Sequence, residues 1–544
     1  MKFSHYNYFN SMIQDQLRQI KAGGLRTLGR KLKKAGWHLL LRLTAPAIVC
    51  LGIDWPKAYD FLASRIFRKT KKLRIQPDLN NKELIDRLVE QSIICLKKNT
   101  TRKHDLAGLP DWARGQFLLG NLYRLNNELK KSLDLYKIVD EGRRQVFQKH
   151  GLDDLGIEFI PRALPVGSMG VYEYLEMNIK ARILDACPQK KMILLLPPGA
   201  TVNNLCYLKY WRKYLAIVSD PALIERLAPL EALFTNPVVE MTYFREKLYW
   251  SCLAQGLVRE QWIQEARPPF FTLSQEDKEK GWNCLRSLGL SKDAWFVTLH
   301  VREPGWRDDH SREENFRNAN IESYFPAIKT ITDAGGWVVR IGDPGMSQLP
   351  EMPNVIDYAH SQAKSDWMDI FLCAQCRFFI GTSSGMCVVA SSFGVPLAMT
   401  NLLPGYGVYH FTSRDLFIPR LCFSEEKGRY LSFQELLSPP VSTATIQSHF
   451  DKAKVRIVAN EAEEIKALVE EMLEKAAGSL RYREEDEALQ KNFRAITSNC
   501  GKLYGDLNLV SHGCIGREFL RRHADLLTGI KDVKKENSLM EVIT

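Results

Sequence analysis

The sequence lacks a hydrophobic run long enough to cross a membrane. Its main candidate, Leu39 to Ile53, contains Arg42 and Pro46 and falls short of the roughly 20 residues that a spanning helix needs. This run begins far from Met1, and no small-residue cleavage site clearly follows it, so we expect no cleavable signal peptide. These absences favour a cytoplasmic protein whose apolar run lies in the membrane interface and does not cross the membrane.

Metal-binding motifs are also scarce. The twelve cysteines are scattered, and only Cys373 and Cys376 form a CxxC, without a second CxxC or a nearby histidine pair to complete a zinc set. Their spacing places both on one face of a helix, so we interpret them as core cysteines. The adjacent Asp308 and Asp309, followed by His310, are typical of a solvated polar loop. The sequence therefore predicts no bound metal and no cofactor.

Acidic residues are scarce at the N-terminus. Residues 1–104 carry 22 Lys and Arg against 7 Asp and Glu, whereas the remaining 440 residues carry 53 against 56, so this region accounts for the net charge of +12. No zinc-finger, RNA-recognition or helix-turn-helix signature accompanies the charge, which argues against nucleic acid as a partner. Apolar residues recur at mostly three- or four-residue steps, as in an amphipathic basic helix: Leu17, Ile20, Leu25, Leu28, Leu32, Leu39 and Leu43.

Two interpretations of this basic region are open. The helix can attach the chain peripherally to an anionic membrane through residues 1–55, with Leu39 to Ile53 in the interface. Alternatively, its apolar face packs on the protein's own core. We favour membrane attachment for a helical region 1–109. Residues 110–150 resemble one tetratricopeptide repeat, and because a single repeat cannot bury its own hydrophobic face, we predict a helical connector there.

An α/β region is predicted over residues 151–285. Expected strands lie at 157–160, 191–196, 215–218 and 237–240, with a helix from Val171 to Leu184 after the first of them. Gly167, Ser168 and Gly170 precede this helix and Glu173 lies in its first turn. The run lacks the full dinucleotide fingerprint, so it fits either a cleft loop that approaches a ligand or an ordinary tight turn.

A second α/β region is clearer and is predicted over residues 286–480. Strands at 295–302, 337–341, 354–357, 377–381 and 395–400 alternate with helices, and residues 481–544 are expected to form a helical tail. Ligands bind beyond the carboxyl ends of strands in open parallel sheets. Polar residues gather where these strands end, and we predict that they bind a phosphate-containing ligand: His300, Arg302, Arg340, Asp343, Thr382, Ser383, Ser384 and Gly385.

Several of these segments together carry a family resemblance. The chain resembles a bacterial family of surface-polysaccharide glycosyltransferases in five motifs: Thr298-Leu-His-Val-Arg-Glu-Pro-Gly305, Arg317-Asn-Ala-Asn-Ile-Glu-Ser-Tyr324, Gly336-Trp-Val-Val-Arg-Ile-Gly-Asp343, Asp366-Trp-Met-Asp369 and Phe379-Ile-Gly-Thr-Ser-Ser-Gly385. The resemblance is dense from about 295 to 405 and thin elsewhere. It implies a GT-B-like pair of doubly wound Rossmann-type domains, in which the second binds a nucleoside-diphosphate sugar and the first receives a glycan or lipid-linked acceptor.

The resemblance also implies roles for individual residues. The His300-x-Arg302 strand end is similar to that of fucosyltransferase-type enzymes, in which such an arginine contacts the donor diphosphate. We therefore predict Arg302 and His300 as catalytic residues, and Gly167, Ser168, Gly170 and Glu173 as acceptor-cleft candidates. The glutamate that grips the ribose in many GT-B enzymes is absent from the helix after Gly385. Asp343 can replace it or can simply form a turn.

The catalytic base and the stereochemistry stay open. Glu303, Asp308, His310 and Glu173 are all conceivable bases, and a retaining reaction needs none of them. A nucleotide-sugar epimerase would share the two-domain cleft but would have no use for an interfacial arm. A non-catalytic adaptor of a polysaccharide assembly complex is a third alternative. The membrane-associated transferase explains most features.

Overall fold

The computed structural model describes residues 129–527 with gaps at 163, 167–168, 185–189, 236–240, 246, 304–315, 404, 445 and 502–509, and single positions between 113 and 123. The predicted membrane-interface region, the acceptor-cleft candidates Gly167 and Ser168, and the strand expected at 237–240 lie outside the described residues. The chain divides into two compact units, Met1–Leu155 and Gly156–Thr544. None of the described helices is both long and apolar enough to span a membrane.

The first unit contains a long helix, α6 (Leu129–Lys149), followed by the short η1 (Asp153–Leu155). Tyr136 and Val139 on α6 are fully buried. A Cβ atom added at Gly120 would lie 2.5 Å from Cε1 of Tyr136, so the backbone at Gly120 packs directly against this ring. The helical connector over 110–150 stays a prediction, because most of residues 110–128 lie outside the described part of the chain.

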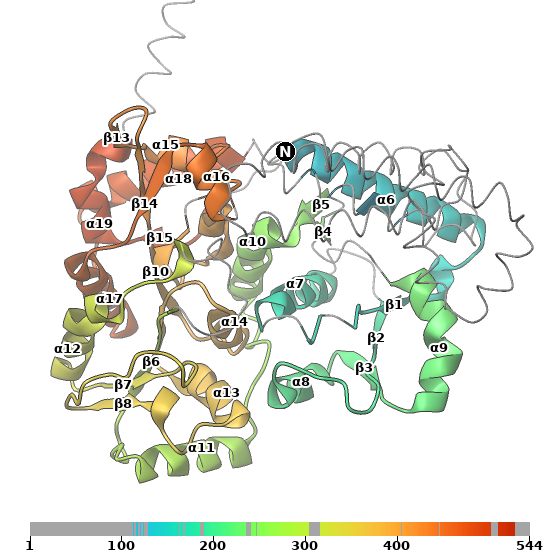
Figure 1. The fold of residues 1–544 in the computed structure, drawn as a ribbon, viewed down its shortest axis with the longest axis horizontal. Coiled ribbons are helices and arrows are strands. Elements are labelled where there is room, and N and C mark those ends of the chain that lie inside the picture. The colour runs from blue at the N-terminus through green and yellow to red at the C-terminus, as the bar shows by residue number, and fades with distance from the viewer. Residues whose placement is uncertain are drawn as a thin grey trace, which may run out of the picture. The chain divides into compact units, whose positions relative to one another are not determined.

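The second unit begins with a parallel sheet in the order β1-β2-β3 (Figure 1). Asp220 caps the helix that follows the third strand, accepting a 2.7 Å hydrogen bond from the Leu223 amide, and Pro221 occupies the first helical position. The elements of this part are β1 (Ile157–Phe159), η2 (Met169–Val171), α7 (Tyr172–Ile183), β2 (Lys191–Leu195), α8 (Leu205–Trp211), β3 (Leu215–Val218), α9 (Pro221–Phe234), the β4 (Met241–Phe244) and β5 (Lys247–Trp250) hairpin, α10 (Ser251–Gln264) and α11 (Gln275–Ser287).

A parallel seven-stranded sheet forms the centre of the second half, in the order β15-β11-β10-β9-β6-β7-β8. The chain leaves β6 toward β7 on one side and later returns as β9 on the other, so the topological switch point lies between β6 and β9. The elements are β6 (Phe296–His300), η4 (Ile321–Tyr324), α12 (Phe325–Asp333), β7 (Trp337–Arg340), β8 (Val355–Asp357), η5 (Tyr358–His360), α13 (Asp366–Gln375), β9 (Phe379–Gly381), α14 (Gly385–Ser392), β10 (Leu397–Leu402), η6 (Tyr406–His410) and β11 (Leu416–Pro419).

The remaining chain adds an antiparallel sheet in the order β13-β12-β14 and covering helices. Its elements are β12 (Leu421–Ser424), β13 (Arg429–Tyr430), α15 (Phe433–Leu436), α16 (Gln447–Lys452), β14 (Val455–Val458), α17 (Ala462–Ala476), α18 (Glu484–Gly501), β15 (Cys514–Ile515), α19 (Arg517–Arg522) and η8 (Ala524–Leu527). The tail is not wholly helical as expected, because β15 pairs with β11 and extends the large sheet. The mixed α/β fold with two parallel sheets agrees with the sequence prediction.

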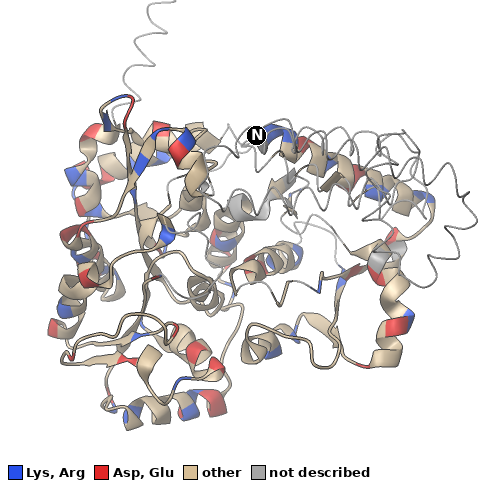
Figure 2. Ribbon diagram, viewed as in Figure 1, with Lys and Arg blue, Asp and Glu red and all other residues tan. Residues whose placement is uncertain are grey.

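Charges of both signs are interspersed along the helices of the second unit (Figure 2). For example, α17 carries five glutamates and two lysines around a buried stripe formed by Ile465, Leu468, Val469 and Met472. This pattern matches the nearly neutral composition of residues 105–544. The basic surplus of the chain therefore belongs to the N-terminal region and not to this folded body.

Candidate functional site

Two of the predicted strand ends meet at the switch point of the large sheet: the end of β6 with His300 and Arg302, and the turn after β9. His300, at the end of β6, is paired in register with Gly381 at the end of β9. The Thr382 amide donates a 3.0 Å hydrogen bond to the His300 carbonyl, and the Arg302 amide donates a 2.9 Å bond to the Thr382 hydroxyl. Arg302 itself is half-buried. Two segments about 80 residues apart in the chain are thereby held side by side.

Gly381 makes this close approach possible. Its φ of +153° lies in a region that side-chain-bearing residues rarely adopt, and a Cβ atom there would lie 1.9 Å from the His300 carbonyl oxygen. The two strand ends could not approach so closely with any other residue at this position. The glycine therefore positions the Thr382 hydroxyl beside the Arg302 backbone.

The turn after Gly381 leads into the N-terminus of α14. Ser384 is the N-cap residue, but its side chain makes no capping hydrogen bond, and its buried Oγ has no partner among the described residues. The Ser383 carbonyl accepts a 3.3 Å hydrogen bond from Nη2 of Arg317. Because the first amides of a helix lack intrahelical acceptors, this turn offers amides and hydroxyls to an anion.

His300 is neutral at physiological pH. The side chain is only 8% exposed, and burial, reinforced by the positive charges of Arg340 and Arg302, lowers the pKa of the imidazole to about 4. Its Nδ1 atom has no hydrogen-bond partner within the described part of the chain. A neutral imidazole donates a hydrogen bond from one ring nitrogen and accepts one at the other, but it cannot supply a positive charge to a diphosphate.

Arg340, which is predicted to bind the donor, takes part in a buried ion-pair network. It is fully buried, and its guanidinium forms ion pairs with Glu303 and Asp357, each at 3.0 Å. The same carboxylates accept hydrogen bonds from the Ser347 amide at 2.8 Å and the Leu349 amide at 2.9 Å. Through these two carboxylates, Arg340 holds the loop after β7 in place. Arg340 could contact a donor directly only if these ion pairs broke.

Asp343 lies in that same loop. Its Oδ1 accepts a 2.9 Å hydrogen bond from the Gly345 amide, two residues further along the chain. This is the geometry of an aspartate that forms a turn through its own backbone. The structure thus favours the turn-forming alternative for Asp343, and ribose binding by its second oxygen stays a prediction.

Part of the predicted acceptor cleft packs against the donor turn. A Cβ atom added at Gly385 would lie 2.5 Å from Cβ of Met169 and 2.8 Å from the Gly170 amide nitrogen. The loop that precedes α7 therefore packs against the first residue of α14. Gly170 and Gly385 come from the two different α/β regions, and only the fold places them together.

Glu173 lies one turn beyond this contact, beside a buried group of charges. Nη2 of Arg259 lies 3.8 Å from the Glu173 carboxylate and 3.6 Å from that of Glu176, which Lys180 approaches to 2.5 Å. The Glu173 side chain is 17% exposed. Burial raises its pKa to about 7, although the positive charge of Arg259 opposes the rise. A carboxylate with this pKa can exchange a proton near neutral pH.

The structure distinguishes among the four conceivable catalytic bases. Asp308 and His310 lie outside the described residues. Glu303 is 5% exposed, and its two oxygens are engaged by Arg340 and by the Ser347 amide. Glu173 has a titratable carboxylate next to the contact between the two α/β regions. Of the two candidates within the described residues, Glu173 is therefore better suited to proton transfer.

Cys373 and Cys376 lie on α13, and both are buried free thiols, as expected for core cysteines. No group of three or more potential metal ligands occurs among the described residues. Sequence reasoning did not single out Arg259 and Arg317 as site residues. Arg317 lies in a motif that carries the family resemblance, whereas nothing in the sequence around Arg259 marks it.

Comparisons with known proteins give only distant likenesses. No family model and no curated protein sequence matches the chain. Among solved structures, the chain is similar to the iron-containing dodecameric glycosyltransferase TibC of enterotoxigenic E. coli, with 13% identity, coverage of 60% of this chain and 76% of that one, and a TM-score of 0.30. A second TibC structure, described as a heptosyltransferase in complex with ADP-D-beta-D-heptose, gives 12% identity, coverages of 60% and 78%, and a TM-score of 0.30.

A family 9 glycosyl transferase from Veillonella parvula is also similar, with 16% identity, coverage of 45% of this chain and 67% of that one, and a TM-score of 0.21. Likenesses at this level carry no argument about activity.

Proposed function

We propose that the protein is a glycosyltransferase that moves a sugar from a nucleoside-diphosphate sugar to a glycan or lipid-linked acceptor in bacterial surface polysaccharide synthesis. The observation that carries the proposal is the meeting of the β6 and β9 carboxyl ends at the switch point, where Arg302 lies beside the turn that opens α14. The sequence resemblance supports the same activity. The donor diphosphate would lie between Arg302 and this turn.

The chemistry of glycosyl transfer matches these groups. Cleavage of the donor leaves a nucleoside diphosphate on which negative charge develops, and preorganised donors and cations stabilise that charge in the transition state. Arg302 supplies a planar guanidinium suited to phosphate oxygens. The amides and hydroxyls from Thr382 to Gly385 supply further donors, and neutral His300 can add one hydrogen bond.

The proposed acceptor side lies where the loop before α7 packs on Gly385. Glu173 would take the proton from the attacking hydroxyl in an inverting reaction, because its pKa lies near neutral pH. Arg259, 3.8 Å away, would then stabilise the carboxylate form before transfer. The nearby Gly170 would let the acceptor approach the backbone closely.

The proposed location is the cytoplasmic face of the cell membrane, with residues 1–55 as the peripheral attachment. The support is the concentration of Lys and Arg in residues 1–104, since each basic side chain near an anionic surface contributes about 1 kcal/mol to binding. A lipid-linked acceptor would lie in the same membrane. The attachment would then bring the enzyme to its substrate.

The proposal is tested by a thermal-shift panel of nucleoside diphosphates and their sugars, followed by transfer assays with the best donor. A ligand that binds only the folded state raises the melting temperature in proportion to its affinity and concentration. Arg302→Ala should abolish most transfer and weaken diphosphate binding, and Arg302→Lys should rescue little, because a point charge does not reproduce the planar fork. The matched control is Arg377→Ala, which removes an exposed arginine just before the amino end of β9.

Arg377→Ala should bind and transfer like the wild type. If no nucleotide stabilises the wild-type protein, the proposed function is wrong. If folded Arg302→Ala binds and turns over donor as well as the wild type does, the donor site lies elsewhere.

A further inference from the structure

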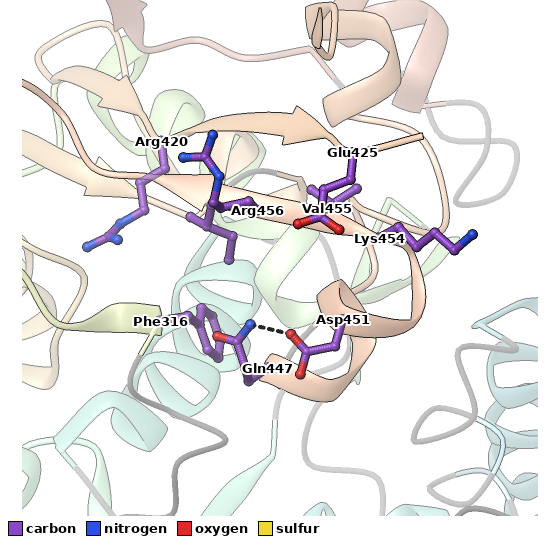
Figure 3. A pocket seen from close by; sticks show the side chains of 9 residues that line it. Phe316, Arg420, Glu425, Gln447, Asp451, Lys454, Val455 and Arg456 are labelled. Carbon is purple, nitrogen blue, oxygen red and sulfur yellow. Dashed lines mark hydrogen bonds between the residues drawn. The ribbon is translucent and has the colours of Figure 1, made fainter. Parts of the chain in front are cut away.

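A cavity of about 400 Å³ opens beside the antiparallel sheet, between β14 and α16 (Figure 3). Phe316 forms one of its walls, and Arg420, the residue directly after β11, lines it as well. Because β11 is parallel to β6 and β9, its carboxyl end lies on the same edge of the large sheet as the proposed donor site. The volume falls in the lower part of the roughly 300–1,000 Å³ typical of ligand pockets.

Three consecutive residues connect this cavity with the donor turn. Phe316 lines the cavity, Arg317 donates a hydrogen bond to the Ser383 carbonyl at 3.3 Å, and the Asn318 carbonyl accepts one from Nη2 of Arg420 at 2.6 Å. The segment therefore touches the donor turn on one side and the cavity on the other. A ligand in the cavity would be a neighbour of the reacting groups.

Arg420 carries a buried charge that no described carboxylate neutralises. It is only 5% exposed, its Nε and Nη2 donate to the carbonyls of Asn401 and Asn318, and no Asp or Glu of the described residues lies within 4.0 Å of it. Burial lowers the pKa of its guanidinium, since its charge has lost water without gaining an anion. Buried charges in proteins are normally paired. An anionic ligand group would supply the missing partner.

The backbone that holds Arg420 is strained. Asn401 has φ of +50°, an uncommon value for a residue with a side chain, and it is buried at 3% exposure. The pairing of β10 with β11 shifts register between Met399 and Leu402, around this residue. Reciprocal hydrogen bonds between Asn401 and Asn460 maintain the conformation. Strained backbone of this kind clusters at ligand-binding sites.

The other lining groups suit a polyhydroxylated ligand. Glu425 and Asp451 only accept hydrogen bonds, whereas Arg456 and Lys454 only donate them, and sugar hydroxyls can satisfy both kinds. Gln447 donates a 2.8 Å hydrogen bond to Asp451, which orients that carboxylate (Figure 3). Phe316, which is 6% exposed and packs against Phe450, closes the cavity with an apolar wall.

We propose that this cavity binds a sugar residue bearing a carboxylate, with the acid group at Arg420 and Arg456 and the hydroxyls at Glu425 and Asp451. The inference rests on the proposed glycosyltransferase activity and specifies its substrate class as an acidic glycan. The lining holds three basic side chains, Arg420, Lys454 and Arg456, against the two carboxylates, and this surplus of one positive charge matches a carboxylate better than a phosphate dianion. A neutral sugar would leave the charge of Arg420 unpaired.

The test is a titration of the full-length protein with glucuronate, glucose and inorganic phosphate. Binding is measured by calorimetry or by saturation-transfer NMR. We expect glucuronate to bind at least about tenfold more tightly than glucose or phosphate, since a charge-assisted hydrogen bond contributes that much. Arg456 is exposed, and Arg456→Gln should remove most of the preference for glucuronate. Arg420→Gln should remove it too, but it also loses hydrogen bonds that hold the backbone. Arg456→Gln keeps those hydrogen bonds and loses the contact of the Arg456 guanidinium with the Phe423 ring, so it is the decisive variant. Lys452→Gln, on α16 but outside the lining, is the matched control and should keep the preference.

Equal binding of glucuronate and glucose, tighter binding of phosphate, or an unchanged preference in Arg456→Gln would each overturn the inference. Nucleoside diphosphate binding is measured on the same samples and should be unchanged in Arg456→Gln. If nucleotides bind but glucuronate does not, only this inference fails. If no nucleotide binds the wild type, the proposed function fails separately. Transfer assays then show which substrate carries the acidic sugar. In one assay glucuronate is supplied as part of the nucleotide sugar, and in the other as part of the acceptor glycan.

Discussion

The Arg302 amide donates a hydrogen bond to the Thr382 hydroxyl at 2.9 Å, although 80 residues separate the two in sequence. The hydroxyl is buried, with Thr382 at 1% exposure. This bond joins the end of β6 to the turn after β9, so the geometry of the proposed donor site depends on it. The two segments act as one unit, and a change in either should affect both.

Thr382→Val should therefore destabilise the protein and weaken nucleotide binding. The substitution keeps the shape of the side chain but leaves the Arg302 amide without its acceptor, which costs about 1–3 kcal/mol for a buried group. Thr382→Ser keeps the hydroxyl and is the control. Urea denaturation and nucleotide titration measure the two effects. Equal stability and affinity of the Val and Ser variants would show that the hydrogen bond contributes little.

Gly381→Ala should be far more damaging than an alanine at another glycine with positive φ. At Gly381 a Cβ atom would lie 1.9 Å from the His300 carbonyl oxygen, whereas at Gly478, with φ of +71°, no atom lies within 4 Å. Gly478→Ala should cost only about 1 kcal/mol of backbone strain. Gly381→Ala should cost several times as much or fail to fold. Similar midpoints of urea unfolding for the two variants would contradict the close approach.

Glu173 should make stability depend on pH. Its folded pKa of about 7 lies above its ordinary value of 4.5, so the folded state binds the proton more tightly and stability falls as pH rises from about 4.5 to 7. The loss is at most ~3.5 kcal/mol, at ~1.4 kcal/mol per pKa unit. Glu173→Gln should remove this part of the dependence, measured by urea unfolding at pH 5 and pH 8.

The activity of the same variant gives a separate readout. If Glu173 is the base, Glu173→Gln should lose most transfer at every pH while it still binds nucleotide. In the wild type, transfer should rise with pH through about 7, because the carboxylate form is the base. Retained transfer by Glu173→Gln, together with an unchanged pH profile, would exclude Glu173 from proton transfer.

Glu303→Ala should destabilise the protein strongly. Arg340 would keep only Asp357 as a partner, and the Ser347 amide would lose its acceptor. Breaking a buried ion pair by removing one partner costs about 3–5 kcal/mol. The control is Glu265→Ala, which breaks the more exposed pair with Arg267 and should change stability by less than ~1 kcal/mol. Comparable losses in the two variants would argue against the structural role of the Arg340 network.

The basic region should attach the protein to anionic vesicles. The full chain should float with vesicles that contain phosphatidylserine at low salt and should be released as salt rises, because screening weakens the attraction of its lysines and arginines. A variant lacking residues 1–55 should stay unbound. Retention of the full chain under both high-salt and alkaline washing would indicate insertion and not peripheral attachment. Absence from the vesicles at low salt would favour packing of the helix on the core.

The periodicity of the sequence determined the alternation of strands and helices in the second unit. Buried parallel strands appear in a sequence as short apolar runs bounded by glycines and by helix-capping residues. The ends of β6, β7 and β9 could therefore be predicted to within two residues. Polar residues come directly after these apolar runs in the sequence. This order predicted a site containing His300, Arg302 and Thr382.

Only the tertiary structure decided what each polar residue contacts. Arg340 and Arg302 both end apolar strands in the sequence, but the fold pairs Arg340 with two carboxylates and leaves Arg302 half-buried at the edge. The pKa of Glu173 depends on its burial and on Arg259, 86 residues away, and the cavity beside Arg420 depends on α16 and β14. Burial and electrostatic partners are set by contacts between residues distant in sequence, and periodicity carries no record of them.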